Sequence, residues 1–372
     1  MKKKVLITGG AGFIGSHVAD ELLQNGYSVR VLDVLSPQMH QNNGHRPNYL
    51  APEVELIKGD IRIARDIDQA LKGVDVVYHF AAAVGVGQSM YKIADYTSTN
   101  NEGTAVLLEA LATTPIERLV VASSMSIYGE GLYKNNRERL VSPNERSLDQ
   151  LAARRWELFD TDGNELRPIA TPESKRPGVP SVYALSKYYQ ERMCLTVGAA
   201  YGIPTVALRF FNVYGTRQAL SNPYTGVVAI FASRLLNNQQ PLINEDGQQQ
   251  RDFVSVHDVA RACRLALEVS AAAGQVMNIG SGRAITITSV AESLAKMLGK
   301  KRLQPSITSR YRKGDIRHCF ADISLARHVL GYEPKVRFES GMEEVVEWLA
   351  GETATDRVAE AHAELVSRGL AA

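Results

Sequence analysis

In Val5-Leu6-Ile7-Thr8-Gly9-Gly10-Ala11-Gly12-Phe13-Ile14-Gly15-Ser16-His17, an apolar run breaks into glycines and then continues as a helical pattern. The stretch predicts a strand, a tight turn and a helix. Glycine suits such a turn because its backbone reaches φ/ψ values denied to other residues, and because a side chain would keep a pyrophosphate from the helix N-terminus. A dinucleotide site is therefore expected. Its predicted contacts here are Gly9, Gly12, Phe13 and Ile14.

A second apolar run, Ser28 to Leu32, ends on Asp33. At this place a carboxylate accepts hydrogen bonds from both hydroxyls of an adenosine ribose. The same charge repels the 2′-phosphate of NADP, and the next residue is Val34 rather than a lysine or arginine. The sequence therefore predicts NAD as the cofactor.

Composition excludes several classes of function. The chain has 372 residues, and 42 Lys and Arg against 40 Asp and Glu give a net charge near zero, so a nucleic-acid-binding surface is not expected. Its cysteines, Cys194, Cys263 and Cys319, lie too far apart for a metal motif or a disulfide framework. No run reaches the roughly 20 apolar residues that cross a bilayer. A cytoplasmic protein without a metal site or membrane partner is expected.

Two later strands end in further candidate cofactor contacts. The strand Val54 to Ile57 leads to Gly59-Asp60-Ile61-Arg62, where Asp60 and Ile61 are expected near the adenine, because residues past the end of a parallel strand face the ligand crevice. The apolar run 74–82 ends in small residues that permit close approach of the nicotinamide ribose. The contacts expected from this run are Phe80, Ala81 and Ala82.

These motifs resemble the extended short-chain dehydrogenase/reductase family, which contains the nucleotide-sugar epimerases and dehydratases. The resemblance rests on Thr-Gly-Gly-Ala-Gly-Phe-Ile-Gly at 8–15, Gly-Asp-Ile-Arg at 59–62 and His-Phe-Ala-Ala at 79–82, and it spans about residues 4 to 349. It implies an α/β fold with a Rossmann-type, doubly wound parallel sheet and a smaller C-terminal substrate-binding lobe.

The predicted catalytic residues are Ser124, Tyr183 and Lys187. In a helix opening at Tyr183-Ala184-Leu185-Ser186-Lys187, Tyr183 and Lys187 share a face, and a nearby cation lowers the pKa of a phenol from about 10. The resemblance implies that Tyr183 is base and acid, that Lys187 also holds the nicotinamide ribose, and that Ser124 binds the reacting oxygen. It also implies that Asn100 lies near the cofactor, with the neighbouring Asn101 as the alternative match to the same family asparagine.

The resemblance divides the chain into an NAD-binding domain, 1–205, and an interleaved nucleotide-sugar lobe, 206–350. An insertion at about 131–178 is expected to hold a β-hairpin turning at Asp162-Gly163-Asn164. The insertion is either a surface flap, or a lid or subunit contact, and the sequence leaves both roles open. A helical tail, 351–372, follows, with no assigned role. Helices near 103–111 and 183–201 are expected to pair in a homodimer.

The substrate is expected to be a nucleotide-diphosphate sugar. The resemblance implies contacts to the diphosphate from Asn212, Arg251 and Arg312, and a nucleobase wall that begins at Val227. Residues beside Ser124 and after the fourth strand are expected at the sugar: Met125, Ser126 and Val84. Of these, Met125 and Val84, with Val86, are proposed to face a sugar methyl.

The net reaction is expected to be 4-epimerisation through a transient 4-keto sugar. Dehydratases of the family carry an Asp-Glu pair where this chain has Met125 and Ser126, so no acid is available there for elimination. The insertion and the run 218–226 resemble dTDP-L-rhamnose 4-epimerases, which interconvert dTDP-L-rhamnose and dTDP-6-deoxy-L-talose. The alternatives are a UDP-glucose, UDP-N-acetylglucosamine or uronic acid 4-epimerase, a dehydratase, and an NAD-binding regulatory protein.

Overall fold

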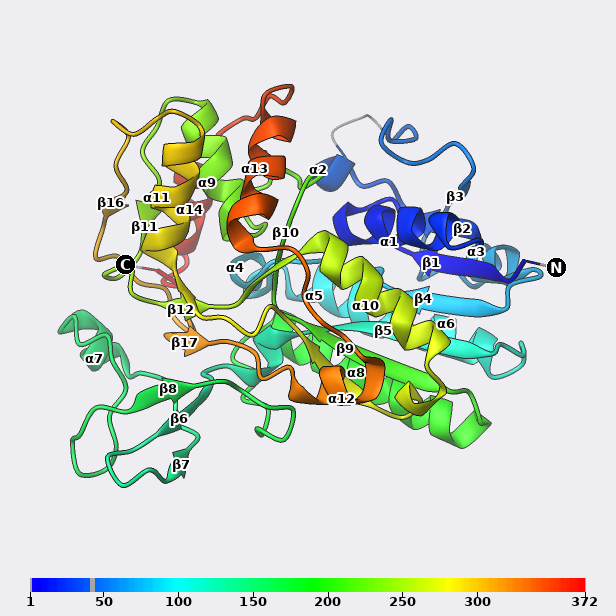
Figure 1. Cartoon of the computed structure of the whole chain (residues 1–372), viewed down its shortest axis with the longest axis horizontal. Helices are drawn as coiled ribbons and strands as arrows, with labels where there is room; N and C mark the ends of the chain where they lie inside the picture. The colour runs from blue at the N-terminus through cyan, green and yellow to red at the C-terminus, as the bar shows by residue number, and fades with distance from the viewer. Residues whose placement is uncertain (1, 41–43, 372) are drawn as a thin grey trace.

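The computed structural model describes residues 2–40 and 44–371. Within these ranges, seven parallel strands form a central sheet in the order β14-β9-β5-β4-β1-β2-β3 (Figure 1). This order, which runs outward in both directions from β1, confirms the predicted doubly wound sheet. The strands are β1 (Lys4–Thr8), β2 (Ser28–Asp33), β3 (Glu55–Lys58), β4 (Val76–His79), β5 (Arg118–Ser124), β9 (Thr205–Phe210) and β14 (Val276–Ile279).

Strand β1 lies at the centre of this sheet and is covered on both faces. Val5 pairs with Val29 of β2 on one side and with Val76 of β4 on the other. Val5 and Ile7 point into one core cluster, whereas Leu6 points into the opposite one. A strand buried on both faces needs consecutive apolar residues, which is why β1 reads as an unbroken apolar run.

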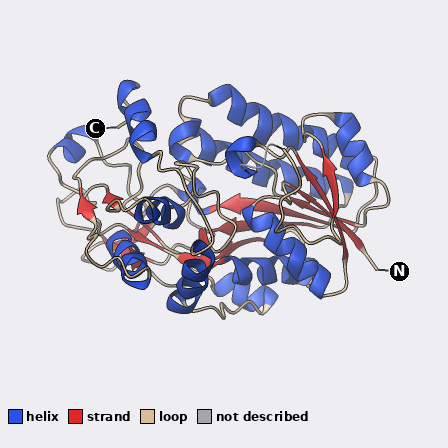
Figure 2. Ribbon diagram, turned by 90° about the horizontal axis from the view of Figure 1, so that it is seen from above, coloured by secondary structure: helices blue, strands red, loops and turns tan. Residues whose placement is uncertain are grey.

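Helices cover both faces of the sheet, as Figure 2 shows. Because alternate strand residues point to opposite faces, each helical layer packs on its own apolar cluster. One layer contains α1 (Phe13–Gln24), α10 (Val256–Glu268) and α12 (Ser324–Leu330). The other contains α3 (Ala64–Leu71), α6 (Gly103–Leu111) and α8 (Val182–Tyr201).

Helix α8 has well-defined ends. The Ser181 hydroxyl accepts a hydrogen bond from the Ala184 amide at 3.1 Å, which caps the N-terminus. Gly202 ends the helix in the left-handed region, with φ of 69°. These caps fix the first turn of α8, and therefore Tyr183, at the carboxyl edge of the sheet.

A second lobe packs around its own apolar core. The core lies between helices α9 (Val227–Leu236), α11 (Ile287–Met297) and α13 (Phe338–Leu349). Short strands connect this lobe to the sheet: β10 (Asn212–Tyr214) with β13 (Phe253–Ser255), β11 (Leu242–Ile243) with β16 (Ser306–Ile307), and β12 (Gln250–Arg251) between β15 (Ile285–Thr286) and β17 (His318–Cys319). The boundaries predicted at 205 and 350 stay a prediction. Strand β9 of the central sheet begins at the first boundary, and β14 lies well beyond it, within the stretch predicted as the second lobe.

The insertion forms a small antiparallel sheet beside the second lobe, at the lower left of Figure 1. Its elements are β6 (Leu132–Lys134), β7 (Leu140–Val141), α7 (Leu148–Ala152) and β8 (Arg167–Ile169). The expected hairpin is present, because Phe159 and Glu165 form an antiparallel bridge. The Asp160 side chain accepts hydrogen bonds from the amides of Asp162 and Asn164 at 3.0 and 2.8 Å, which closes the turn.

Buried ion pairs join the insertion to the second lobe. The Arg317 guanidinium, fully buried, donates to Glu157 of the insertion and to Asp246 of the lobe. Arg146 of the insertion donates to Glu245 of the lobe at 2.8 Å. Buried charges are tolerated when they are paired in this way, so the network fixes how the insertion sits.

Shorter elements complete the chain: α2 (Pro37–His40), α4 (Val86–Ser89), α5 (Ile93–Tyr96), a π-helical turn (Thr97–Glu102), two 3₁₀ turns (Met125–Tyr128 and Ser270–Ala272) and α14 (Val358–Ser367). The tail predicted to be helical, 351–372, contains α14. In the described part of the chain, no helix is both long enough and apolar enough to cross a membrane.

The Glu157 carboxylate predicts a pH-dependent stability. Burial acts to raise its pKa, but hydrogen bonds from His318 and Arg317 outweigh this and hold the pKa at about 2, below the ordinary 4.5. A lowered folded-state pKa stabilises the fold above pH 4.5, and the gain is lost as pH falls toward 2. We expect Glu157→Gln to lower the free energy of unfolding at pH 7, and the difference from wild type to shrink below pH 4.5.

Urea unfolding between pH 3 and pH 7 measures this difference. Glu165→Gln, which changes an exposed glutamate of the same hairpin, is the matched control and should behave like wild type. If Glu157→Gln lowers the free energy of unfolding by the same amount at every pH, the assignment of this pH dependence to Glu157 is wrong.

Candidate active site

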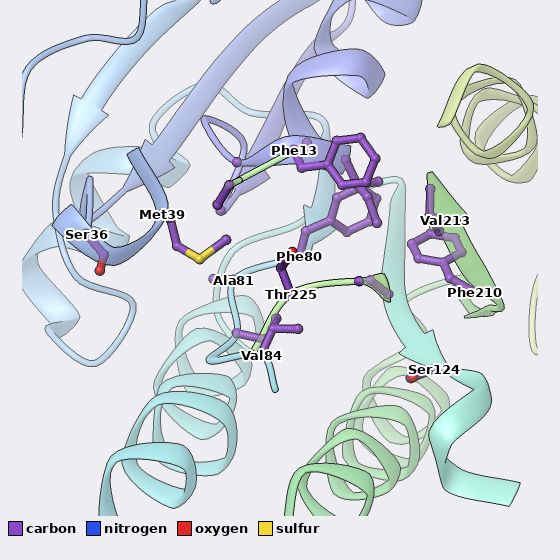
Figure 3. Close-up of a pocket in the computed structure, with 18 of the residues that line it drawn as sticks. Phe13, Ser36, Met39, Phe80, Ala81, Val84, Ser124, Phe210, Val213 and Thr225 are labelled. Carbon is purple, nitrogen blue, oxygen red and sulfur yellow. The ribbon is translucent and has the colours of Figure 1, made fainter. Parts of the chain in front are cut away.

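A cavity of about 420 Å³ lies at the carboxyl edge of the sheet, between the sheet and the second lobe (Figure 3). Most of the predicted contacts line it. From the cofactor prediction these are Gly9, Gly12, Phe13, Ile14, Asp33, Asp60, Ile61, Phe80, Ala81 and Ala82. From the catalytic and substrate predictions they are Ser124, Tyr183, Lys187, Val84, Asn212 and Val227.

The glycine turn after β1 provides the close approach that a dinucleotide needs. Gly9 has φ of 69°, and a Cβ there would lie 2.8 Å from the Cα of Ala81, at the end of β4. A Cβ on Gly15 would lie 2.6 Å from the Cα of Gly10. Only glycine therefore lets β1, β4 and α1 converge, and the N-terminus of α1, with its partial positive charge, faces the cavity through Phe13 and Ile14.

Asp33 is anchored at the end of β2. Its Oδ2 accepts the Ala11 amide at 3.1 Å, and its Oδ1 accepts the Leu35 amide at 2.9 Å. The two bonds tie the carboxylate to the glycine turn and orient it on the cavity wall. A glycine cradle, a helix N-terminus and a ribose-binding carboxylate together fit NAD.

Asp60 follows β3 and is paired with Arg62. The hydrogen bond from Arg62 Nε, 2.9 Å long, is the main reason that the pKa of Asp60 lies below its ordinary value. Asp60 therefore stays ionised, and Ile61 beside it packs on Gly103, where a Cβ would lie 2.5 Å from Ile61 Cγ2.

The predicted catalytic groups converge, but their electrostatics differ from the expectation. Burial raises the pKa of Tyr183, and a hydrogen bond with the Ser124 hydroxyl acts in the opposite direction. Burial also lowers the pKa of Lys187 to about 8. The Lys187 ammonium donates to Gln190 Oε1 at 2.7 Å. The expectation that Lys187 already lowers the pKa of Tyr183 is thus not met in this structure, because burial is the dominant cause and the opposing contribution comes from Ser124.

Lys187 belongs to a buried polar chain that sequence reasoning missed. Gln190 Nε2 donates to Thr104 Oγ1 at 2.9 Å, and that hydroxyl lies 2.8 Å from Nε2 of His79. Burial lowers the pKa of His79 to about 3, so this histidine is a neutral member of the chain. The signal for Gln190 was only its position, three residues after Lys187 on the same helix.

Ser126 and Asn100 position other residues. Ser126 Oγ donates to Ser124 Oγ at 2.9 Å, and its amide donates to the same oxygen at 3.2 Å. Asn100, fully buried, accepts the Ala83 amide at 2.7 Å and donates to Ser186 Oγ at 2.8 Å. Asn100 therefore links the loop after β4 to the catalytic helix.

Six predicted contacts do not line the cavity in the described structure: Val86, Asn100, Ser126, Met125, Arg251 and Arg312. Met125 is buried in the core of the sheet. The Arg251 guanidinium donates to the backbone carbonyls of Gln250 and Arg317, each at 2.9 Å. Arg312 pairs with Asp315 at 3.0 Å. Both arginines are thus held by protein groups beside the site.

Other lining residues come from segments without a recognisable motif. Met39 and His40 of α2 reach the cavity, as do Gln218, Ala219 and Thr225 of the second lobe. Val84 and Thr225 lie close to each other in the view of Figure 3. The residues of the second lobe fall in the run 218–226 that carries the resemblance, but no sequence signal placed them, or Met39 and His40, at the cavity, because long-range contacts bring these loops to the site.

A family model described as the NAD dependent epimerase/dehydratase family matches residues 5–148 and 162–280. The chain belongs to this family. The unmatched stretch 149–161 falls within the insertion described above.

Curated and solved relatives agree with this membership. The chain is 35% identical over 355 residues to a dTDP-L-rhamnose 4-epimerase of Burkholderia thailandensis, covering 94% of this chain and 96% of that protein. It is similar to the structure of a Thermotoga maritima UDP-glucose 4-epimerase with UDP-glucose, with a TM-score of 0.75, 32% identity, and coverage of 93% and 98%. A Thermus thermophilus UDP-glucose 4-epimerase in complex with NAD gives a TM-score of 0.74, 30% identity, and coverage of 94% and 100%.

These matches confirm the predicted family, fold and NAD cofactor, and they place the chain among enzymes whose named members are nucleotide-sugar 4-epimerases. The residue assignments within the site are not tested by the matches, and they stay predictions.

Asp33 predicts the cofactor preference. Asp33→Asn removes the charge and replaces one acceptor oxygen by an amide that cannot accept from Ala11 or Leu35. We expect NAD affinity to fall about tenfold or more, since a charge-assisted hydrogen bond is lost, and discrimination against NADP to weaken. Titration calorimetry with both cofactors measures this, and Asp95→Asn, an exposed aspartate that does not line the cavity, is the control. Equal affinity of the wild-type protein for NAD and NADP would contradict the role of Asp33.

Proposed function

We propose that this enzyme inverts C4 of a nucleotide-diphosphate sugar, and that its substrates are dTDP-L-rhamnose and dTDP-6-deoxy-L-talose. The observation that carries the reaction type is the distribution of carboxylates. Among the described residues that line the cavity, only Asp33 and Asp60 are acidic; Asp33 ends β2 and Asp60 follows β3, on the cofactor side. Elimination needs an acidic or basic side chain beside the sugar, and the two positions after Ser124 hold Met125 and Ser126. This favours epimerisation over dehydration.

Tyr183 and Ser124 would move and hold the proton. The Tyr183 phenolate takes the proton of the C4 hydroxyl and returns it to the same oxygen after the sugar has turned over. The Ser124 hydroxyl, oriented by Ser126, donates to that oxygen while it is a carbonyl. Bound NAD supplies reversible hydride acceptance at C4.

Lys187 is the cation assigned to lower the pKa of the phenol. It lies one helical turn after Tyr183 and lines the same cavity. Its own pKa of about 8 means that it is largely charged at neutral pH. A positive charge that approaches the phenol stabilises the phenolate and opposes the effect of burial on Tyr183.

The apolar sugar end of the cavity supports a 6-deoxy sugar. Val84, whose side chain is apolar, lines the cavity beside Thr225. A methyl group at C6 needs such a surface, whereas a hydroxyl needs a hydrogen-bond partner. The identity to the Burkholderia thailandensis enzyme supports the same choice. The named activity of the two structural relatives makes UDP-glucose the competing substrate.

The homodimer through α6 and α8 stays a prediction. Leu185 and Tyr201 are exposed on α8, which is consistent with a partner on that helix. Sedimentation velocity measures the assembly state.

Tyr183→Phe tests the reaction mechanism. The variant lacks the proton-transferring hydroxyl, so we expect kcat to fall about 10²- to 10⁴-fold while nucleotide-sugar binding changes little. Tyr201→Phe, which changes an exposed tyrosine of the same helix, is the control and should keep wild-type turnover. Normal kcat in Tyr183→Phe would assign the proton transfer to another residue.

A substrate panel tests the sugar. Purified enzyme is incubated separately with dTDP-L-rhamnose, UDP-glucose and UDP-N-acetylglucosamine, and the C4 proton is followed by NMR. We expect epimerisation of the rhamnose compound and little of the others. Preference for a UDP-sugar would leave 4-epimerisation standing and reject the rhamnose assignment. No turnover of any of the three would favour the regulatory protein.

A further inference from the structure

The C-terminal tail contacts three segments around the sugar end of the cavity. We call residues 355–371, which contain α14, the C-terminal strap. Near its start, the Thr355 amide donates to Ser221 Oγ at 2.9 Å, and Asp356 pairs with Arg234 of α9 at 2.8 Å. At its end, the Leu370 carbonyl accepts the Lys313 amide at 3.1 Å. The strap therefore joins the loop before α9 to the segment that carries Arg312.

Helix α14 also packs on α4 and on the loop that follows it. Leu365, buried on the inner side of α14, lies over Gly87, where a Cβ would be 3.4 Å from Leu365 Cδ1. The Arg368 guanidinium stacks on the Tyr91 ring, 4.5 Å from its centre. These two side chains are the contacts of the strap with the segment after β4.

That segment is linked in turn to both walls of the sugar end. Tyr91 and Tyr224 share a hydrogen bond of 2.6 Å between their hydroxyls, and Tyr224 directly precedes Thr225 of the cavity wall. On the other side, Ser89 Oγ accepts the backbone amide of Tyr183 at 3.0 Å. Helix α4 therefore lies between the strap and the first turn of the catalytic helix.

From these contacts we propose that the C-terminal strap fixes the positions of the two segments that line the sugar end of the cavity, and that Leu365 and Arg368 are positioning residues for the sugar. Neither side chain lines the cavity, so each acts through α4 and the Tyr91–Tyr224 pair. The segment of Val84, which precedes α4, packs directly on Tyr224, because a Cβ on Gly85 would lie 2.9 Å from Tyr224 Cβ. The strap holds this contact from behind, and the resulting placement of Val84 and Thr225 selects the sugar that fits. The inference rests on the proposed function for the statement that a sugar binds at this end.

Hydrogen exchange tests the strap without using turnover. In Arg368→Ala and Leu365→Ala, we expect peptides covering 84–92 and 220–227 to exchange faster than in wild type, while peptides of β1 and β2 do not change. Arg357→Ala and Val366→Ala, which change exposed residues of the same tail, are matched controls and should exchange like wild type in both loops. Faster exchange confined to α14 would overturn the proposal, because the tail would then detach without loosening the site.

Binding measurements separate the sugar from the nucleotide. We expect Arg368→Ala to weaken the nucleotide sugar about two- to fivefold, as for loss of an exposed cation–π contact, and Leu365→Ala to weaken it more. Affinity for the nucleoside diphosphate alone should stay within about twofold, NAD content should not change, and KM should rise with little change in kcat. Equal weakening of the sugar nucleotide and the free diphosphate would reject a role at the sugar.

The probes are dTDP-L-rhamnose with dTDP, and UDP-glucose with UDP. If wild type binds neither nucleotide sugar, the proposed function fails, and the exchange of the two loops still decides whether the strap positions them. Tyr91→Phe adds a finer test, because it keeps the ring under Arg368 and removes only the hydroxyl that bonds Tyr224. We expect faster exchange in 220–227 and unchanged exchange in α14. No change in 220–227 would remove Tyr91 from the proposed linkage.

Discussion

The close approach of three backbone segments at Gly9 is the constraint on which the site depends. The end of β1, the end of β4 and the start of α1 meet where a single Cβ on Gly9 would lie 2.8 Å from the Cα of Ala81. Asp33 strengthens the junction because its carboxylate binds the Ala11 amide of the same turn. The helix N-terminus and the carboxylate are thereby held in one fixed arrangement, which suits a ligand with a pyrophosphate and a ribose.

From this junction outward, buried polar contacts rather than exposed charges hold the predicted catalytic residues. Lys187, Gln190, Thr104 and His79 form one chain behind the sheet edge, and Asn100 links the loop after β4 to α8. Buried polar groups are costly unless each has a partner, so such networks favour a single arrangement. The helix that carries Tyr183 is therefore held in place by groups most of which do not line the cavity.

The two parts that lie outside the common motifs attach in different ways. The insertion is joined to the second lobe by ion pairs such as that of Arg317 with Glu157. The cost of burying the Arg317 charge is offset only when the folded structure brings these partners together. The C-terminal strap attaches through apolar packing, one cation–π contact and backbone hydrogen bonds. The first arrangement sets the orientation of a peripheral sheet, whereas the second packs on α4 and the loop after it, next to the cavity.

The sequence by itself determined the sheet, the glycine turn and the NAD preference, because these depend on local rules: apolar runs form buried strands, glycine alone reaches the turn, and a carboxylate ends β2. It also located the hairpin at 162–164 and the tail helix, since turn chemistry and helical periodicity are local as well. Only the tertiary structure decided that Met125 faces the core, that backbone carbonyls hold Arg251, and that burial raises the pKa of Tyr183. It alone placed Met39, Gln218 and the strap at the site, because contacts between residues far apart in the chain leave no periodic pattern for the sequence to reveal.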